Sequence, residues 1–160
     1  VRSAEDNRRQ PQRLEPVDQW LRNLLTRWQL MRPEASWQWL PVPTSSAPQV
    51  QASPELGQAV LNLLNNAADA CAEGIEITLD WDPQRVCLHI RDHGPGVPLD
   101  IAEQLGTAFL TTKGKKGFGL GLFLSLAAVE RIGGSVRLFN QEGGGTLTEV
   151  LLPIATEVKS

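Results

Sequence analysis

The chain has 160 residues, with 15 Lys or Arg, 18 Asp or Glu and a formal net charge of −3, a size that fits one ordinary domain and excludes two large ones. No basic block stands out, which argues against nucleic-acid binding, and no run approaches about 18 consecutive apolar residues. Two cysteines are too few for a disulfide framework or a four-cysteine metal site.

The first elements follow a polar start. Residues 1–15 show no apolar period and are predicted to be a linker or the end of an upstream element. The only methionine is Met31, and the start lacks the pattern of a signal peptide, so we expect a soluble piece of a longer protein. From Val17 the apolar residues recur at helical spacing until Pro33, which predicts a helix with Asp18 available as its cap.

Two short strands, over residues 36–42 and 50–52, precede a second predicted helix. That helix opens with a capping Ser53, a proline at its first position and an acidic residue in its first turn. Its apolar face runs from Leu56 to Cys71. The helical repeat of 3.6 residues places three polar side chains in a stripe on a different face: Asn62, Asn66 and Asp69.

The second half of the chain predicts a sheet with one more helix. Alternating apolar residues over 75–81 and 86–90, joined by an Asp-Pro-Gln turn, predict an antiparallel hairpin. Helical periodicity runs from Leu120 to Arg131, and a final strand pair is predicted over 135–140 and 146–153. Helices and antiparallel strands in blocks predict a two-layer α/β (α+β) sandwich.

An amide pair on the second helix is the first candidate for chemistry. Asn62 and Asn66 stand four residues apart on one face, and their carbonyl oxygens suit a hard cation such as Mg²⁺ beside phosphates. Taken alone, the segment is more typical of solvated helix residues than of a metal site.

Two glycine-containing segments also indicate a nucleotide site. Asp92 at a strand end can accept a hydrogen bond from an exocyclic amine, while Gly94 and Gly96 let backbone approach a flat ring; an acidic turn is the simpler alternative. The run 117–122 leads into a helix, where free N–H groups can cradle phosphate. A dinucleotide-binding turn is disfavoured because a polar cationic loop, not a buried strand, precedes this run. The glycines at 143–145 fit a plain hairpin turn equally well.

Five motifs in this order resemble the ATP-binding catalytic domain of sensor histidine kinases, within the family that includes gyrase-, Hsp90- and MutL-type ATPases. They are the N box (Asn62–Ala67), the G1 box (Asp92–Gly96), the F box (Phe109–Lys113), the G2 box (Gly117–Leu122) and a final glycine box (Gly143–Thr146). The resemblance spans about residues 17–153 and implies a Bergerat-type ATP-binding fold, with a mixed, largely antiparallel sheet packed on one face by three helices. It also implies that residues 16–155 form the catalytic domain, with 1–15 a linker or the end of an upstream dimerisation region and 156–160 a tail.

The resemblance assigns roles to individual residues. Asn62, Asn66 and Lys113 would be catalytic at the phosphate end, with Asn66 as the Mg²⁺ ligand, and Asp92 would bind the adenine amine. The other expected ATP contacts are Gly94, Gly96, Phe109, Thr112, Gly117, Gly119, Leu120, Gly121, Leu122 and Thr146. The chain departs from the family after the N box: the family often has Lys and Tyr where this chain has Asp69 and Ala70, which leaves any phosphate or sugar contact there open.

The resemblance also bears on the reaction. ATPase relatives place a Glu as general base where this chain has Asn62, and an amide is a poor base, so phosphoryl transfer is favoured over a hydrolytic ATPase or a non-catalytic nucleotide-binding module. Neither His89 nor His93 is expected to be the phosphoacceptor, because neither lies on a helix.

The implied partners lie outside the chain. They are a histidine-containing dimerisation domain of the same parent and a response regulator, with no nucleic acid. The fragment is expected to be a monomer, and the parent a homodimer anchored in the inner membrane of a bacterium with this domain in the cytoplasm. The run 117–125 is similar to RegB/PrrB-type redox-sensing kinases. Cys71 on an apolar helix face and Cys87 in a strand are nonetheless expected to be buried and structural.

Overall fold

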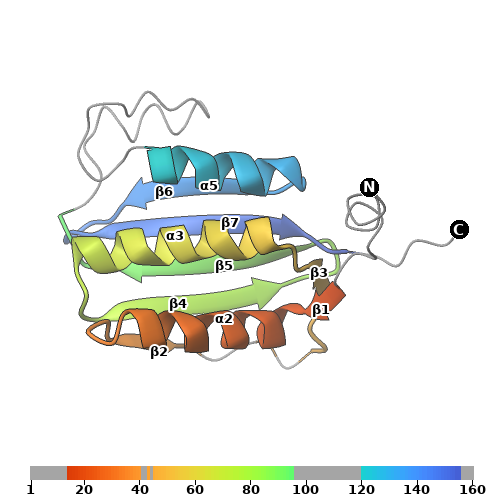
Figure 1. Cartoon of the computed structure of the whole chain (residues 1–160), viewed down its shortest axis with the longest axis horizontal. Coiled ribbons are helices and arrows are strands. Elements are labelled where there is room, and N and C mark those ends of the chain that lie inside the picture. The colour runs from red at the N-terminus through yellow and green to blue at the C-terminus, as the bar shows by residue number, and fades with distance from the viewer. Residues whose placement is uncertain (1–13, 41–42, 44, 96–119, 156–160) are drawn as a thin grey trace, which may run out of the picture.

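A computed structural model describes residues 14–40, 43, 45–95 and 120–155 of the chain. Two layers make up the fold, a five-stranded sheet and three helices that lie side by side over one of its faces (Figure 1). The predicted sandwich, including the three helices on a single face, is confirmed.

The main sheet is mixed and has the strand order β2-β4-β5-β7-β6. Only the first pairing, β2 with β4, is parallel, and the other three pairings are antiparallel. The predicted hairpin and final strand pair are confirmed. The strand bounds are β2 Trp37–Trp39, β4 Ile75–Trp81, β5 Arg85–Asp92, β6 Ser135–Asn140 and β7 Thr146–Pro153.

The three helices are α2 Val17–Met31, α3 Pro54–Ala70 and α5 Leu120–Arg131. The Ser53 hydroxyl accepts the backbone N–H of Leu56 at 3.1 Å, which confirms the predicted cap of α3. The predicted cap of α2 is wrong: the helix begins one residue before Asp18, whose carboxylate accepts the N–H of Gln19 instead. None of the helices in the described ranges is long and apolar enough to span a bilayer.

The core lies between the helix layer and the sheet. Alternate residues of β4 and β5 point into it, and α2 contributes Trp28 and three leucines that are fully buried. Each buried Leu or Ile contributes about 1.5–3 kcal/mol relative to an exposed side chain. The other, open face of the sheet carries the intervening residues, which are mostly polar on β4 and β5 but include Leu147 and Leu151 on β7, and it is covered by none of the described helices (Figure 1).

A small second sheet corrects the prediction for the start of the chain. Leu14–Pro16 form a strand, β1, which pairs with β3 (Gln49–Gln51), although residues up to 15 were predicted to be a linker. The N–H of Val17 donates to the carbonyl of Pro48, and the N–H of Ala155 donates to that of Gln49. Both ends of the described chain therefore meet at β3, to the right in Figure 1.

The cysteines differ from the prediction. Cys71 lies just beyond the last residue of α3, is only partly buried and donates its thiol to the carbonyl of Glu73 at 3.5 Å. Cys87 lies on the open face of the sheet and is also only partly buried, because β5 turns its even-numbered residues toward the helices. Neither thiol belongs to the core.

Candidate functional site

The predicted adenine-binding carboxylate stands at the end of β5. Asp92 is 4 % exposed, and its Oδ1 accepts the backbone N–H of Gly94 at 2.9 Å. Burial raises the pKa of Asp92, while hydrogen bonds from the backbone of Gly94 and of Thr146 oppose that rise. The two backbone donors hold a buried acceptor in one orientation, which suits recognition of a donor on a ligand.

Two glycines allow three segments to meet around Asp92. A Cβ on Gly94 would lie 2.6 Å from the Cβ of Ala70 and 2.9 Å from its carbonyl oxygen, so the G1 box packs directly on the end of α3. A Cβ on Gly145 would overlap the carbonyl of Asp92, and Gly145 has a φ of +95° that L side chains rarely adopt. Glycine at positions 94 and 145 is therefore a geometric requirement of the site.

Ala70, one of the positions at which this chain departs from the family, lies against Gly94. The Ala70 methyl and carbonyl form the surface on which Gly94 rests. A larger residue here would have to direct its side chain away from Gly94. The Ala70 side chain itself offers no hydrogen-bonding group to a phosphate or a sugar.

The predicted amide pair lies on a partly exposed face of α3. Asn62 accepts a hydrogen bond from the Gln58 side chain at 3.0 Å. Within the described residues, Asn66 makes no side-chain hydrogen bond, so its carbonyl oxygen is available to a ligand. The donor set fits Mg²⁺, which takes neutral and anionic oxygens and keeps several waters.

The third residue of the predicted stripe, Asp69, is engaged elsewhere. Its Oδ1 accepts from Arg32 at 3.0 Å, in an ion pair that links α3 to the end of α2. Asn65 takes part in the same contact: its Oδ1 accepts from the indole of Trp28 and from Arg32, both at 3.0 Å. The polar surface of α3 thus divides into a side facing α2 and a side that holds Asn62 and Asn66.

The role of Asn65 was missed because its partners, on α2 and at its C-terminal cap, are more than 30 residues away in sequence. The only available signal was a third asparagine next to a predicted pair.

The remaining predicted contacts fall into two groups. Thr146 is 5 % exposed, begins β7 and lies directly opposite Asp92. Leu120 and Gly121 form the first turn of α5, and Leu122 is buried in the core, where it packs the helix against the fold. The other predicted residues lie outside the described part of the chain: Gly96, Phe109, Thr112, Lys113, Gly117 and Gly119.

One end of the molecule thus brings together the end of β5, the start of β7, the end of α3 and the start of α5, to the left in Figure 1. The buried carboxylate of Asp92 and the amide of Asn66 lie on elements that meet there. A ring with an exocyclic amine and a phosphate chain with a cation are the chemistry that such groups serve.

Comparison with known proteins agrees with this arrangement. The family model described as histidine kinase-, DNA gyrase B-, and HSP90-like ATPase matches residues 51–156. The sensor protein DegM of Bacillus sp. (strain B21-2) is 36% identical over 102 residues, which cover 62% of this chain and 27% of DegM. The two-component sensor PprA of Pseudomonas aeruginosa is 35% identical over 130 residues, or 75% of this chain and 14% of PprA. The chain thus spans only a small part of these relatives.

Solved structures share the fold. The nucleotide-free catalytic domain of histidine kinase ThkA has a TM-score of 0.70 at 22% identity, covering 92% of this chain and 99% of that one. The mycobacterial sensor histidine kinase MprB has a TM-score of 0.66 at 26% identity, covering 92% and 100%. Because the family model spans well over half of the sequence, the chain belongs to the histidine kinase-, DNA gyrase B- and HSP90-like ATPase family, as an ATP-binding catalytic domain of the sensor histidine kinase type.

Proposed function

We propose that this domain transfers the γ-phosphoryl group of ATP to a histidine on a separate dimerisation domain of its parent protein, for relay to a response regulator. The observation that carries the proposal is the pairing of a buried, backbone-held Asp92 with an amide, not a carboxylate, at position 62. The first group serves nucleotide binding. The second cannot act as the general base that hydrolysis needs.

Asp92 supplies the adenine contact in this proposal. Its orientation is set before ligand arrives, because the N–H of Gly94 already occupies Oδ1 and the backbone of Thr146 also donates to the carboxylate. A charge-assisted hydrogen bond to the adenine amine is worth about 1.5–3 kcal/mol. Gly94 leaves the ring free of a side chain at the point of closest approach.

Asn66 supplies the metal contact, with Asn62 beside it at the phosphate end. Mg²⁺, when bound, offsets the negative charge of the triphosphate. Asn66 offers a neutral oxygen that no described side chain occupies, whereas Asn62 is partly engaged by Gln58. Asn66 is therefore the better ligand of the two, and Lys113 and the glycines of the G2 box are proposed to hold the phosphates.

Phosphoryl transfer is favoured over hydrolysis. General-base activation of water requires a group that can take a proton, and the Asn62 amide cannot do so at neutral pH. An in-line acceptor held by a partner domain avoids this requirement, since positioning supplies most of the catalysis in phosphoryl transfer. A hydrolytic ATPase would release phosphate steadily without any acceptor domain.

The chain's own histidines are poor acceptors. His89 lies on β5, on the sheet face opposite the helices, next to Glu149. His93 follows the same strand, with its ring against Gly74. Neither stands on an exposed helix that could enter a partner's active site.

The test is incubation of this fragment with γ-labelled ATP and Mg²⁺, alone and beside the complete parent protein. We expect the fragment to bind ATP without forming acid-labile phosphate, and the parent to form it. Stoichiometric acid-labile phosphate on the fragment alone would overturn the separate-acceptor proposal. Steady phosphate release from the fragment at the rate of known ATPases would overturn the preference for transfer.

The parent is proposed to be a bacterial homodimer anchored in the inner membrane, with this domain in the cytoplasm and residues 16–155 as its catalytic domain. Membership of the RegB/PrrB-type redox-sensing group is part of the same proposal. Cys87 is a poor redox-sensing residue in this proposal, because burial and the charges of Glu149 and Asp80 raise the pKa of its thiol to about 11. The sequence upstream of residue 1 tests the proposal that the parent carries its own phosphoacceptor, since it should contain a helical histidine segment.

A further inference from the structure

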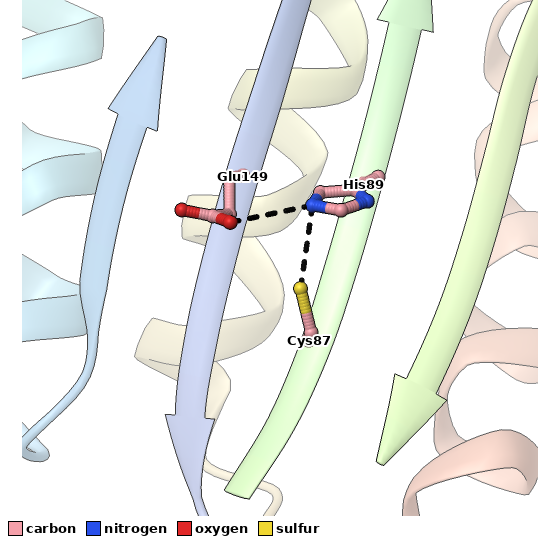
Figure 2. Close-up of side chains that lie close together, drawn as sticks. All are labelled: Cys87, His89 and Glu149. Carbon is pink, nitrogen blue, oxygen red and sulfur yellow. Dashed lines mark hydrogen bonds and ion pairs between the residues drawn. The ribbon is translucent and has the colours of Figure 1, made fainter.

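We propose that the open face of the sheet carries a zinc site formed by Cys87 and His89 of β5 and Glu149 of β7 (Figure 2). The three side chains lie on the face opposite the helices and none belongs to the nucleotide site. The inference is independent of the proposed kinase function.

The ligand atoms converge on one point. His89 Nε2 lies 3.3 Å from Cys87 Sγ and 3.4 Å from Glu149 Oε2, and all three atoms lie within 4.8 Å of one another. A tetrahedral zinc ion with bonds of about 2.0–2.3 Å separates its ligand atoms by about 3.3–3.8 Å. Two of the three spacings already match this geometry, and small rotamer changes would close the third.

The arrangement differs from a proton relay. In a relay, one ring nitrogen faces the nucleophile and the other faces the carboxylate. Here the same nitrogen, Nε2, faces both the thiol and the carboxylate (Figure 2). A single nitrogen can serve only one of these groups by hydrogen bonding at a time, whereas one metal ion satisfies all three.

The register of the sheet explains why the three groups meet. Cys87 and His89 are two residues apart on β5 and so share a face, and Glu149 is directly opposite His89 on β7. Strands hold ligands more rigidly than loops do. Both strands also carry the nucleotide site, because Asp92 and Thr146 form a pair three residues further along.

A neighbouring residue orients the carboxylate. Arg137 of β6 lies opposite Glu149 and donates to its Oε1 at 3.0 Å and 3.2 Å. This leaves Oε2 facing His89. Arg137 thus orients Glu149 as an outer-shell partner orients a metal-binding carboxylate. The side chains of His89 and Glu149 are 33% and 17% exposed, so an ion can enter and keep a water as its fourth ligand.

The donor set selects the metal. A thiolate, an imidazole and a carboxylate together suit Zn²⁺, whereas Mg²⁺ and Ca²⁺ take oxygen ligands. The charges of Glu149 and Asp80, which disfavour a Cys87 thiolate in the free protein, attract a divalent cation to the same place. The proposed Mg²⁺ position at Asn66 on α3 has no sulfur or nitrogen ligand and is a separate site.

The test is titration of the purified chain with ZnCl₂, and with CoCl₂ as a spectroscopic probe. We expect one Zn²⁺ per chain and a near-ultraviolet thiolate-to-cobalt band. At a free Zn²⁺ concentration 100 times the Kd, the unfolding equilibrium constant should fall about 100-fold. Cys87→Ser should abolish the band, and His89→Gln and Glu149→Gln should each weaken Zn²⁺ binding at least 10-fold.

Cys71→Ser is the matched control, because it removes the other thiol and should leave both the band and the affinity unchanged. ATP binding by each variant reports that it has folded. Should Cys87→Ser not fold, alkylation of the wild-type chain followed by peptide mapping decides the question: Zn²⁺ should protect Cys87 and leave Cys71 reactive. The absence of a cobalt band, or a band that survives Cys87→Ser, would overturn the proposal. So would a Zn²⁺ affinity of the His89 and Glu149 variants equal to that of the wild type, or equal alkylation of both cysteines with Zn²⁺ present.

Discussion

At the scale of a residue, the proposed binding role of Asp92 opposes the stability of the fold. Its carboxylate is almost completely buried, and burial raises its pKa despite hydrogen bonds from the backbones of Gly94 and Thr146. The ionised form that the proposed adenine contact needs is therefore the form that the fold disfavours. A neutral side chain of the same shape should separate the two effects.

We expect Asp92→Asn to weaken ATP binding by about 10–150-fold, the loss of one charge-assisted hydrogen bond. The amide oxygen can still accept from Gly94, so the free energy of unfolding should be equal to or higher than that of the wild type. The pKa of Asp92 is raised in the folded wild-type protein. The extra stability of the variant should therefore be present above that pKa and vanish as the pH falls below the ordinary value of 3.8. Calorimetric titration with ATP measures the affinity, and urea denaturation at several pH values measures the free energy of unfolding. Unchanged affinity would show that the adenine contact is misassigned.

Substitutions at Asn65 and Asn66 allow metal binding and folding to be tested separately. Asn66→Ala should remove the Mg²⁺ dependence of ATP affinity and leave stability nearly unchanged, since no described side chain bonds to Asn66. Asn65→Ala is the control: it should cost about 1–3 kcal/mol of stability, because it leaves the indole N–H of the buried Trp28 without its acceptor. Affinity for ATP with and without Mg²⁺, beside chemical denaturation, distinguishes the two. An identical Mg²⁺ response in wild type and Asn66→Ala would contradict the metal assignment.

At the scale of an element, the β6–β7 turn positions the end of β5. Its three glycines all have positive φ, but they differ in what surrounds them. A Cβ at Gly143 would meet nothing within 4 Å, whereas one at Gly145 would overlap the carbonyl of Asp92. The turn is therefore both a tight connection and part of the site's wall.

This difference gives a matched pair of variants. Gly143→Ala should cost only about 1–2 kcal/mol of left-handed strain and should retain ATP affinity. Gly145→Ala should cost more stability and weaken ATP binding, because the overlap displaces Asp92. Thermal unfolding and ATP titration of both variants provide the comparison, and equal ATP affinity in the two would show that the turn does not position Asp92.

At the scale of the whole molecule, a two-stranded sheet closes the fold beside the helices. β1 pairs with β3, and β3 also accepts a hydrogen bond from Ala155 near the other end of the described chain. The first residues of the domain are thus structural from Leu14 onward. The strand β1 thus begins two residues before residue 16, where the catalytic domain is proposed to begin.

Truncation tests this boundary. A chain that begins at Leu14 should keep the wild-type midpoint of unfolding, because residues 1–13 are polar and lack an apolar pattern. A chain that begins at Val17 should be less stable by at least about 1 kcal/mol, since each lost hydrogen bond of the β1–β3 pair contributes about 0.5–1.5 kcal/mol. Denaturation in urea with equal m-values makes the comparison, and equal midpoints for the two chains would show that β1 does not stabilise the domain.

Local patterns in the sequence determined the elements of this protein and the composition of its site. Helical periodicity and cap residues define α3, strict alternation defines β4 and β5, and the order of the motifs identifies the family. These signals act over a few residues, where side-chain spacing directly reflects the backbone period. The places of Asp92 at a strand end and of Thr146 at the start of the last strand could be predicted, because strand alternation is a local signal.

Only the tertiary structure decided which groups meet across the chain. It paired β1 with β3, turned Asp69 and Asn65 toward Arg32 just beyond α2, and placed Ala70 against Gly94. It also brought Glu149 to within 3.4 Å of His89, which is 60 residues away in sequence. Such contacts depend on strand order and helix packing, which the whole core selects by burying its apolar faces, and no local period records them.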